Sequence, residues 1–114
     1  ITNLTAIVAD MTRRTPLADN SIDICLMSNV LHGFVENNET AGVMKEITRV
    51  LKDGGILAVV EFKKLESIPG PPFAIKLSSE QVATAVTPFG YRQEKVVEVG
   101  TYHYAALFTK EQDR

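Results

Sequence analysis

Four polar residues follow apolar runs, at positions where a sheet could present them to a ligand. Asp10 comes directly after the run LTAIVA, and Ser28, Asn29 and His32 end or follow the run IDICLMS. A carboxylate accepts hydrogen bonds from a ligand amine, and an imidazole takes up a proton near neutral pH. These residue types could therefore bind a polar small molecule and remove a proton from it.

Each candidate also has a structural interpretation. Asp10 could cap a turn, and His32 could lie at a loop junction. Glu61, late in another apolar run, could face the same cleft or only end its strand. His103, which lies among tyrosines in a β-rich stretch, is expected to be structural. For Asp10, His32 and Glu61, the sequence alone does not decide between the structural and the functional interpretation.

The elements that must position these residues form a strand–helix–strand pattern. Residues 4–9 predict a strand, and residues 22–28 predict a central strand, because their nearly continuous apolar character suits a strand covered on both faces. Residues 56–62 predict a second buried strand. Such a unit has parallel strands and a right-handed crossover. Because the carboxyl ends of parallel strands meet at one edge, this edge is where a ligand is expected.

A helix over residues 38–52 should join the two strands. Its apolar residues share one helical face and are Val43, Met44, Ile47, Val50 and Leu51. Asn37 or Asn38 is expected to cap its start, and Lys52 with Gly54-Gly55 is expected to end it with a left-handed cap.

The C-terminal half predicts a loop, a helix and a hairpin. The proline-rich residues 68–73 forbid regular structure. Ser78 and Gln81 form a capping box that should start a helix ending near Thr87, before Pro88. Residues 91–99 and 102–109 then predict an antiparallel hairpin.

Composition narrows the class of protein. The 114 residues carry a net charge of −2, and their 12 basic residues are scattered among 14 acidic ones. We expect one domain over residues 1–114 and no nucleic-acid partner, because no basic stripe is present. No apolar run is long enough to span a membrane, so a cytoplasmic location is expected. The lone Cys25 is expected in the core, and one cysteine with two histidines predicts no metal site.

Three segments together resemble a known family, the class I S-adenosylmethionine-dependent methyltransferases. They are VADMTRRTPLADNSIDICLMSNVLH, KEITRVLKDGGILAVVEF and SSEQVATAVTPFGYRQEKVVEVGTYHYAALFTK. The chain is most similar to the methyltransferase type 11 group, which includes ubiquinone and menaquinone biosynthesis methyltransferases. The most specific motifs are the loop of residues 16–23 after an acid at a strand end, and RVLKDGG at 49–55. The resemblance implies an α/β fold, namely the C-terminal part of a Rossmann-like sheet, with parallel strands and a terminal antiparallel hairpin.

The resemblance also implies roles for individual residues. The cofactor is S-adenosylmethionine, with Asp10 accepting a hydrogen bond from its adenine amine and Met11 packing beside it. Ser28 and Asn29 line the cofactor cleft. His32 is the candidate catalytic base, and the acceptor of the methyl group is expected to be a small molecule.

The chain departs from the family pattern in one respect. Its seven glycines form no G-x-G, so the glycine-rich turn that cradles the cofactor is absent, and Ile1 comes just before the family's third strand. We expect a C-terminal portion of the domain, which binds the cofactor weakly or not at all by itself. The strand at 22–28 would then be a bare apolar edge. Either residues 4–9 pair with it, or a second copy does so in a homodimer.

Two other functions compete with this reading. The chain could be a non-catalytic remnant or interaction module that keeps the fold without binding the cofactor. A nicotinamide-dependent Rossmann enzyme is a third alternative, which the antiparallel terminal hairpin disfavours. The identity of the methyl acceptor does not follow from the sequence.

Overall fold

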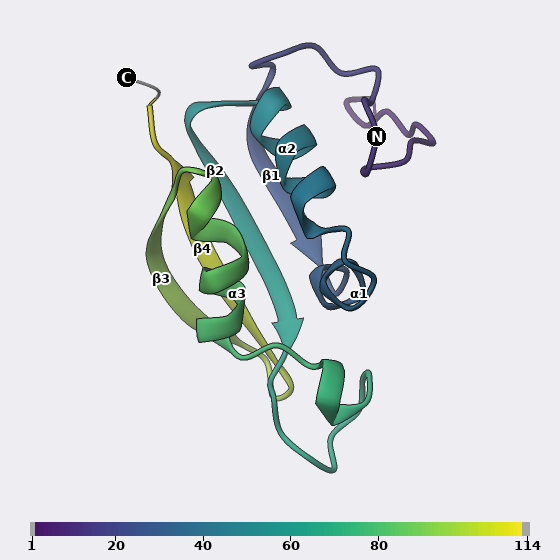
Figure 1. The fold of residues 1–114 in the computed structure, drawn as a ribbon, viewed down its shortest axis with the longest axis vertical. Helices are drawn as coiled ribbons and strands as arrows, with labels where there is room; N and C mark the ends of the chain where they lie inside the picture. The colour runs from purple at the N-terminus through teal and green to yellow at the C-terminus, as the bar shows by residue number, and fades with distance from the viewer. Residues whose placement is uncertain (1, 113–114) are drawn as a thin grey trace.

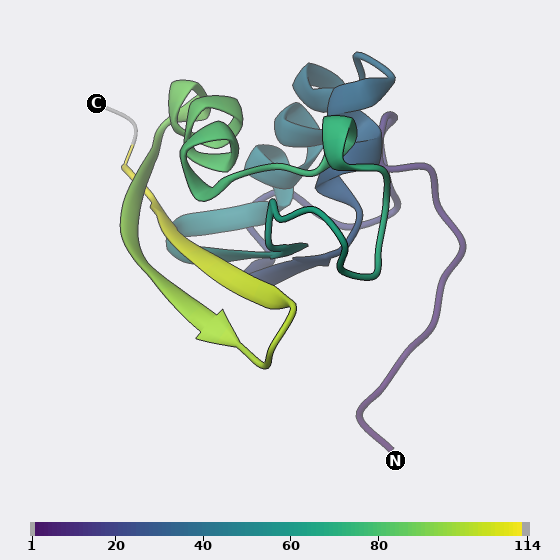
Figure 2. The same ribbon diagram turned by 90° about the horizontal axis from the view of Figure 1, so that it is seen from below.

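The computed structural model describes residues 2–112 and contains one four-stranded sheet with helices on one face (Figures 1 and 2). The sheet order is β1-β2-β4-β3. The elements in chain order are β1 (Ile22–Ser28), α1 (Leu31–Glu36), α2 (Thr40–Val50), β2 (Leu51–Phe62), η1 (Phe73–Ile75), α3 (Ser79–Val86), η2 (Thr87–Phe89), β3 (Tyr91–Val99) and β4 (His103–Lys110).

The sheet confirms the predicted strand–helix–strand unit and hairpin. β1 pairs with β2 in parallel, whereas β2–β4 and β3–β4 are antiparallel. The predicted strand at 22–28 has the observed bounds, and the hairpin strands agree to within a residue or so. Local apolar patterning was therefore enough to locate these strands.

The core lies between the sheet and its helices. On the helix-covered face of the sheet, Met27, Leu57, Val59 and Phe108 are buried. Residues from α2 and α3 pack on them, namely Val43, Met44, Ile47, Val82 and Val86. In Figure 2, α1, α2 and α3 lie on the same side of the sheet. Within residues 2–112, no helix covers the opposite face, where Ile56 is 40% exposed.

Two strand predictions are wrong. Residues 4–9 form no strand and run away from the sheet, with Leu4 74% exposed and Val8 fully exposed (Figure 2). A strand is stabilised by its ladder and its packing, and this segment has neither. β1 is not the central strand that its apolar pattern predicted, but the bare edge that the family resemblance led us to expect, because its only pairing within the described chain is with β2. Its residues Ile24 and Leu26 are 63% and 64% exposed.

The predicted ends of the long helix are also wrong. Asn37 ends the preceding helix α1, with its N–H donating to the Gly33 carbonyl, and Glu39, without a side-chain cap, precedes α2. At the other end, Leu51 is already extended and begins β2, so Gly54, whose φ is +77°, lies within the strand and does not cap the helix. The helix C-terminus is instead held by Lys110, whose Nζ donates to the Thr48 and Leu51 carbonyls, both at 2.7 Å.

The capping box of α3 is confirmed. The backbone N–H of Gln81 donates to Ser78 Oγ at 3.2 Å, and the backbone N–H of Ser78 donates to Gln81 Oε1 at 2.8 Å. Leu77 and Val82, which flank the box, are both buried. The helix begins where the sequence predicted because all of these contacts are local. No helix within residues 2–112 has the length and apolar character needed to cross a membrane.

Candidate functional site at the carboxyl edge of the sheet

The ends of the two parallel strands place the candidate residues together. Ser28 at the end of β1 is in register with Val60 of β2, and the backbone N–H of Asn29 donates to the Val60 carbonyl at 2.8 Å. The helix α1 starts immediately afterwards and carries His32 in its first turn. The predicted edge therefore gathers Ser28, Asn29 and His32, and adds Glu61 from β2.

His32 and Glu61 form the most closely coupled polar pair of this edge. The Nδ1 atom of His32 lies 2.7 Å from Glu61 Oε1, and the backbone N–H of His32 donates to Glu61 Oε2 at 3.1 Å. The Glu61 side chain is only 1% exposed, whereas that of His32 is 16% exposed. Glu61 is thus buried beneath α1, with a histidine as its partner, and its contact with a substrate stays a prediction.

The Glu61–His32 contact was not predicted, although part of its signal is in the sequence. Glu61 alternates with Leu57 and Val59, which places all three on the buried face of β2. A carboxylate at such a position needs a donor, because burying an unpaired charge is costly. The identity of that donor depends on where α1 packs, and α1 itself was not predicted.

Asn29 offers an unsatisfied acceptor at this edge. Its backbone has φ of +60°, a conformation that asparagine adopts more readily than most residues. Its Oδ1 atom is buried and has no hydrogen-bond partner within the described residues. Buried polar atoms are normally paired, so an orphaned one at this edge of the sheet suits a polar ligand. Ser28, exposed at the strand end, stands next to it.

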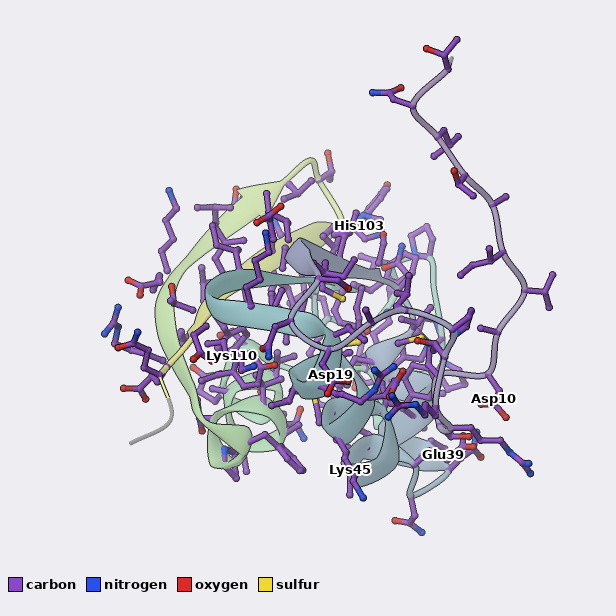
Figure 3. All side chains as sticks on the ribbon, turned by 90° about the horizontal axis from the view of Figure 1, so that it is seen from above. Asp10, Asp19, Glu39, Lys45, His103 and Lys110 are labelled. Atoms are coloured by element: carbon purple, nitrogen blue, oxygen red, sulfur yellow. The ribbon has the colours of Figure 1, made fainter. Side chains whose placement is uncertain are left out.

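Asp10 is engaged within its own turn. Its Oδ1 accepts hydrogen bonds from the Thr12 backbone N–H at 2.9 Å and the Thr12 hydroxyl at 2.6 Å, and Arg13 lies 3.6 Å from Oδ2. These bonds from Thr12 lower the pKa of the Asp10 carboxyl below its usual value. The carboxyl is exposed, where the N-terminal segment leaves the body (Figure 3). Its contacts fit the turn-capping interpretation, and none of them joins it to Asn29 or His32.

Residues 12–21 run beside α2 in the same direction, from Thr12 near Gly42 to Ser21 near Val50, and are tied to it by Glu46. The Thr15 backbone N–H and hydroxyl donate to Glu46 Oε2 at 2.7 and 2.6 Å, and Arg49 donates to both Glu46 oxygens at 2.8 and 2.6 Å. Arg49 also pairs with Asp19 at 2.7 Å. Arg49 and Thr15 hold the pKa of Glu46 at about 2, below its ordinary 4.5. This network fixes the loop that follows Asp10.

Met11 is brought to β1 and lines an apolar groove of about 420 Å³ beside it. Cys25, Phe34 and Ile47 line the same groove. Met11 also packs against the core, and burial raises the pKa of the Cys25 thiol. The groove could accept a flat apolar surface, for which the thioether of Met11 is suited.

The chain belongs to the methyltransferase-domain family. The sequence pattern of the family described as "Methyltransferase domain" matches residues 2–59, just over half of the chain. No curated protein sequence matches it. The order of strands and the terminal antiparallel hairpin agree with this assignment and confirm the Rossmann-like methyltransferase fold.

Solved structures of other proteins have the same fold. A SAM-dependent methyltransferase from Aquifex aeolicus is 29% identical with a TM-score of 0.81, over 95% of this chain and 55% of that one. A type 11 methyltransferase from Sulfolobus solfataricus is 23% identical with a TM-score of 0.77, over 93% and 58%. A [4+2]-cyclase shares the fold at 18% identity and a TM-score of 0.68, over 90% and 54%. The chain thus spans little more than half the length of these proteins.

Proposed function

We propose that this chain is the C-terminal portion of an S-adenosylmethionine-dependent methyltransferase that acts on a small-molecule acceptor. The observation that carries the proposal is the polar edge formed by Ser28, Asn29, His32 and Glu61 at the carboxyl ends of two parallel strands. This is the edge at which α/β sheets bind ligands. Family membership supplies the cofactor class.

The residues present fit part of a cofactor site. The unpaired Asn29 Oδ1 would accept a hydrogen bond from the cofactor, and Ser28 would contact it from the same strand end. Met11 would pack beside the adenine. The Asp10 carboxylate would turn toward the adenine amine when the cofactor binds. S-adenosylmethionine supplies an electrophilic methyl group on a sulfonium, so the protein has chiefly to position the reactants.

His32 is proposed as the base that removes a proton from the acceptor. Its Nδ1 is occupied by Glu61, and its Nε2 has no hydrogen-bond partner within residues 2–112. The His32 side chain is 16% exposed, and the proposal requires a ligand at this edge to reach that nitrogen. A base within hydrogen-bond reach of the acceptor would contribute about 10²–10⁴ in rate.

Calorimetric titration with S-adenosylmethionine tests the proposal. We expect strong binding by a chain extended with the family's glycine-rich segment, and weak binding by the 114 residues alone, because the family's main cofactor-binding turn is not among them. Asn29→Ala should weaken binding by the extended chain, and Glu36→Ala, a change of an exposed residue on α1, is the matched control. Absence of binding by the extended chain would contradict the proposal.

A non-catalytic interaction module is the second candidate, and the exposed residues of β1 favour it. Ile24 and Leu26 present apolar side chains on an edge strand, a surface typical of association sites. The [4+2]-cyclase among the solved neighbours illustrates that this fold serves more than one activity. The same titration separates the candidates, since a module of this kind would not bind the cofactor in either chain.

A further inference from the structure

We infer that Glu61 is a positioning residue that holds His32 in the tautomer with the proton on Nδ1, which leaves the Nε2 lone pair free to act as the base. The inference rests on the proposed function for its catalytic meaning. Its structural content is independent of any cofactor, because it concerns two side chains that already touch each other.

The hydrogen bonds of Glu61 dictate the tautomer. The backbone N–H of His32 can only donate, so it occupies Oε2, and Oε1 is left facing Nδ1 at 2.7 Å. An ionised carboxylate has only acceptors, and therefore Nδ1 must carry the proton. In the neutral ring the other nitrogen, Nε2, then has the lone pair. A carboxylate that accepts a hydrogen bond from one ring nitrogen of a histidine fixes both the orientation of the ring and its tautomer.

Two features make this a preorganised pair. Glu61 is anchored at both oxygens and is 1% exposed, so its position is set before any ligand binds. The neighbouring Tyr104, in register with Glu61 on β4, has its hydroxyl committed to the Leu77 carbonyl and does not compete for the carboxylate. Among the described residues, His32 is the only one whose ring is hydrogen-bonded to the Glu61 carboxylate.

The pair favours an acceptor whose attacking atom carries a proton, such as a hydroxyl group. With S-adenosylmethionine bound, His32 Nε2 would take that proton as the acceptor oxygen bonded to the sulfonium methyl carbon, and the electron pair of the broken carbon–sulfur bond would stay on sulfur. The imidazolium of His32 would be paired with the Glu61 carboxylate until water took the proton. An acceptor with a free lone pair and no proton to lose would not need this base.

The tautomer can be read by ¹⁵N NMR of the histidine rings near pH 8, where an imidazole is neutral. The chain has two histidines, so His103→Gln assigns the signals of His32, and His103 serves as the internal reference. We expect the wild-type protein to show protonated Nδ1 and unprotonated Nε2 at His32. Protonated Nε2 in the wild-type protein would overturn the inference, whatever the behaviour of any variant.

Glu61→Gln should invert the tautomer. The amide has one acceptor oxygen, which the His32 backbone N–H requires, so the amide NH₂ group faces Nδ1 and moves the ring proton to Nε2. Nε2 should then lose its reactivity toward diethyl pyrocarbonate, measured on the His32 peptide with the His103 peptide as the control. A comparable change in catalytic triads costs about 10⁴ in kcat. An unchanged tautomer and reactivity in folded Glu61→Gln would show that Glu61 only anchors α1.

These readouts separate the inference from the proposed function. If the cofactor titration fails while His32 shows protonated Nδ1, the positioning role stands and the methyltransferase assignment falls. If the cofactor binds while Nε2 is protonated, the assignment stands and Glu61 is not the positioning residue. Each result therefore decides one of the two claims.

Discussion

Glu46 should be one of the most important polar residues for stability, because it joins the loop after Asp10 to α2. Glu46→Ala removes an acceptor used by the Thr15 backbone N–H, the Thr15 hydroxyl and two Arg49 nitrogens. Glu46 and Thr15 are 5% and 4% exposed, so water cannot readily replace the lost bonds. Removing one partner of a buried ion pair costs about 3–5 kcal/mol.

The lower end of this range applies, because Arg49 keeps its contact with Asp19. We therefore expect Glu46→Ala to lower the free energy of unfolding by about 3 kcal/mol, which for a domain of this size lowers Tm by about 12 °C. Urea unfolding should show a lower midpoint with an unchanged slope. Glu36→Ala, at an exposed position on α1, is the matched control and should change the midpoint little. Equal changes of the urea midpoint in the two variants would contradict the conclusion that Glu46 joins the loop after Asp10 to α2.

The same network predicts how stability depends on pH. The pKa of Glu46 falls from 4.5 to about 2 on folding, chiefly through its hydrogen bond with Arg49. A carboxyl whose pKa is lowered in the folded state contributes stability above its unfolded value, and this contribution is lost as the pH falls from 4.5 toward 2. Glu46→Ala should flatten that part of the stability curve. A wild-type curve with the same slope as the variant would contradict the role of Glu46.

Three further predictions concern separate parts of the chain. Lys110→Met should lower the free energy of unfolding by about 1.5–3 kcal/mol, because two carbonyls at the end of α2 lose a charged donor; an unchanged urea midpoint would argue against this cap. We propose that β1 pairs with a second copy, so light scattering should detect concentration-dependent association that Leu26→Lys abolishes, whereas a wild-type monomer at all concentrations would exclude it. In the chain extended with the glycine-rich segment, Asp10→Ala should weaken S-adenosylmethionine binding about ten- to a hundredfold, and unchanged affinity in a folded variant would remove Asp10 from the site.

Features of the fold that depend on nearby residues were predictable from the sequence. The bounds of β1, the capping box of Ser78 and Gln81 and the terminal hairpin all follow from patterns within a few residues. The strand expected at 4–9 does not form, because a strand also needs a partner that is distant in the sequence. Residues 4–9 do not pair with β1. The run IDICLMS therefore identified a strand but suggested a central place for it, and only the family resemblance led to its expected position at the edge of the sheet.

The candidate site was predicted in part for the same reason. Ser28, Asn29 and His32 follow one strand, so their proximity is a local property. Glu61 and His32 are 29 positions apart, and Lys110 and Thr48 are 62 apart, so each pair depends on how the elements pack. Asn37 and Asn38 were misassigned to the start of α2 because α1, a short helix with no side-chain cap, gave no sequence signal.

The central claim is that the carboxyl edge of β1 and β2 binds S-adenosylmethionine. Two-dimensional ¹H–¹⁵N NMR of the 114-residue chain, titrated to millimolar cofactor, tests it most directly, because it detects weak binding and locates it. We predict chemical-shift changes at Ser28, Asn29 and His32, with the β3–β4 hairpin unaffected. No change at these residues, or changes confined to the hairpin, would contradict the claim.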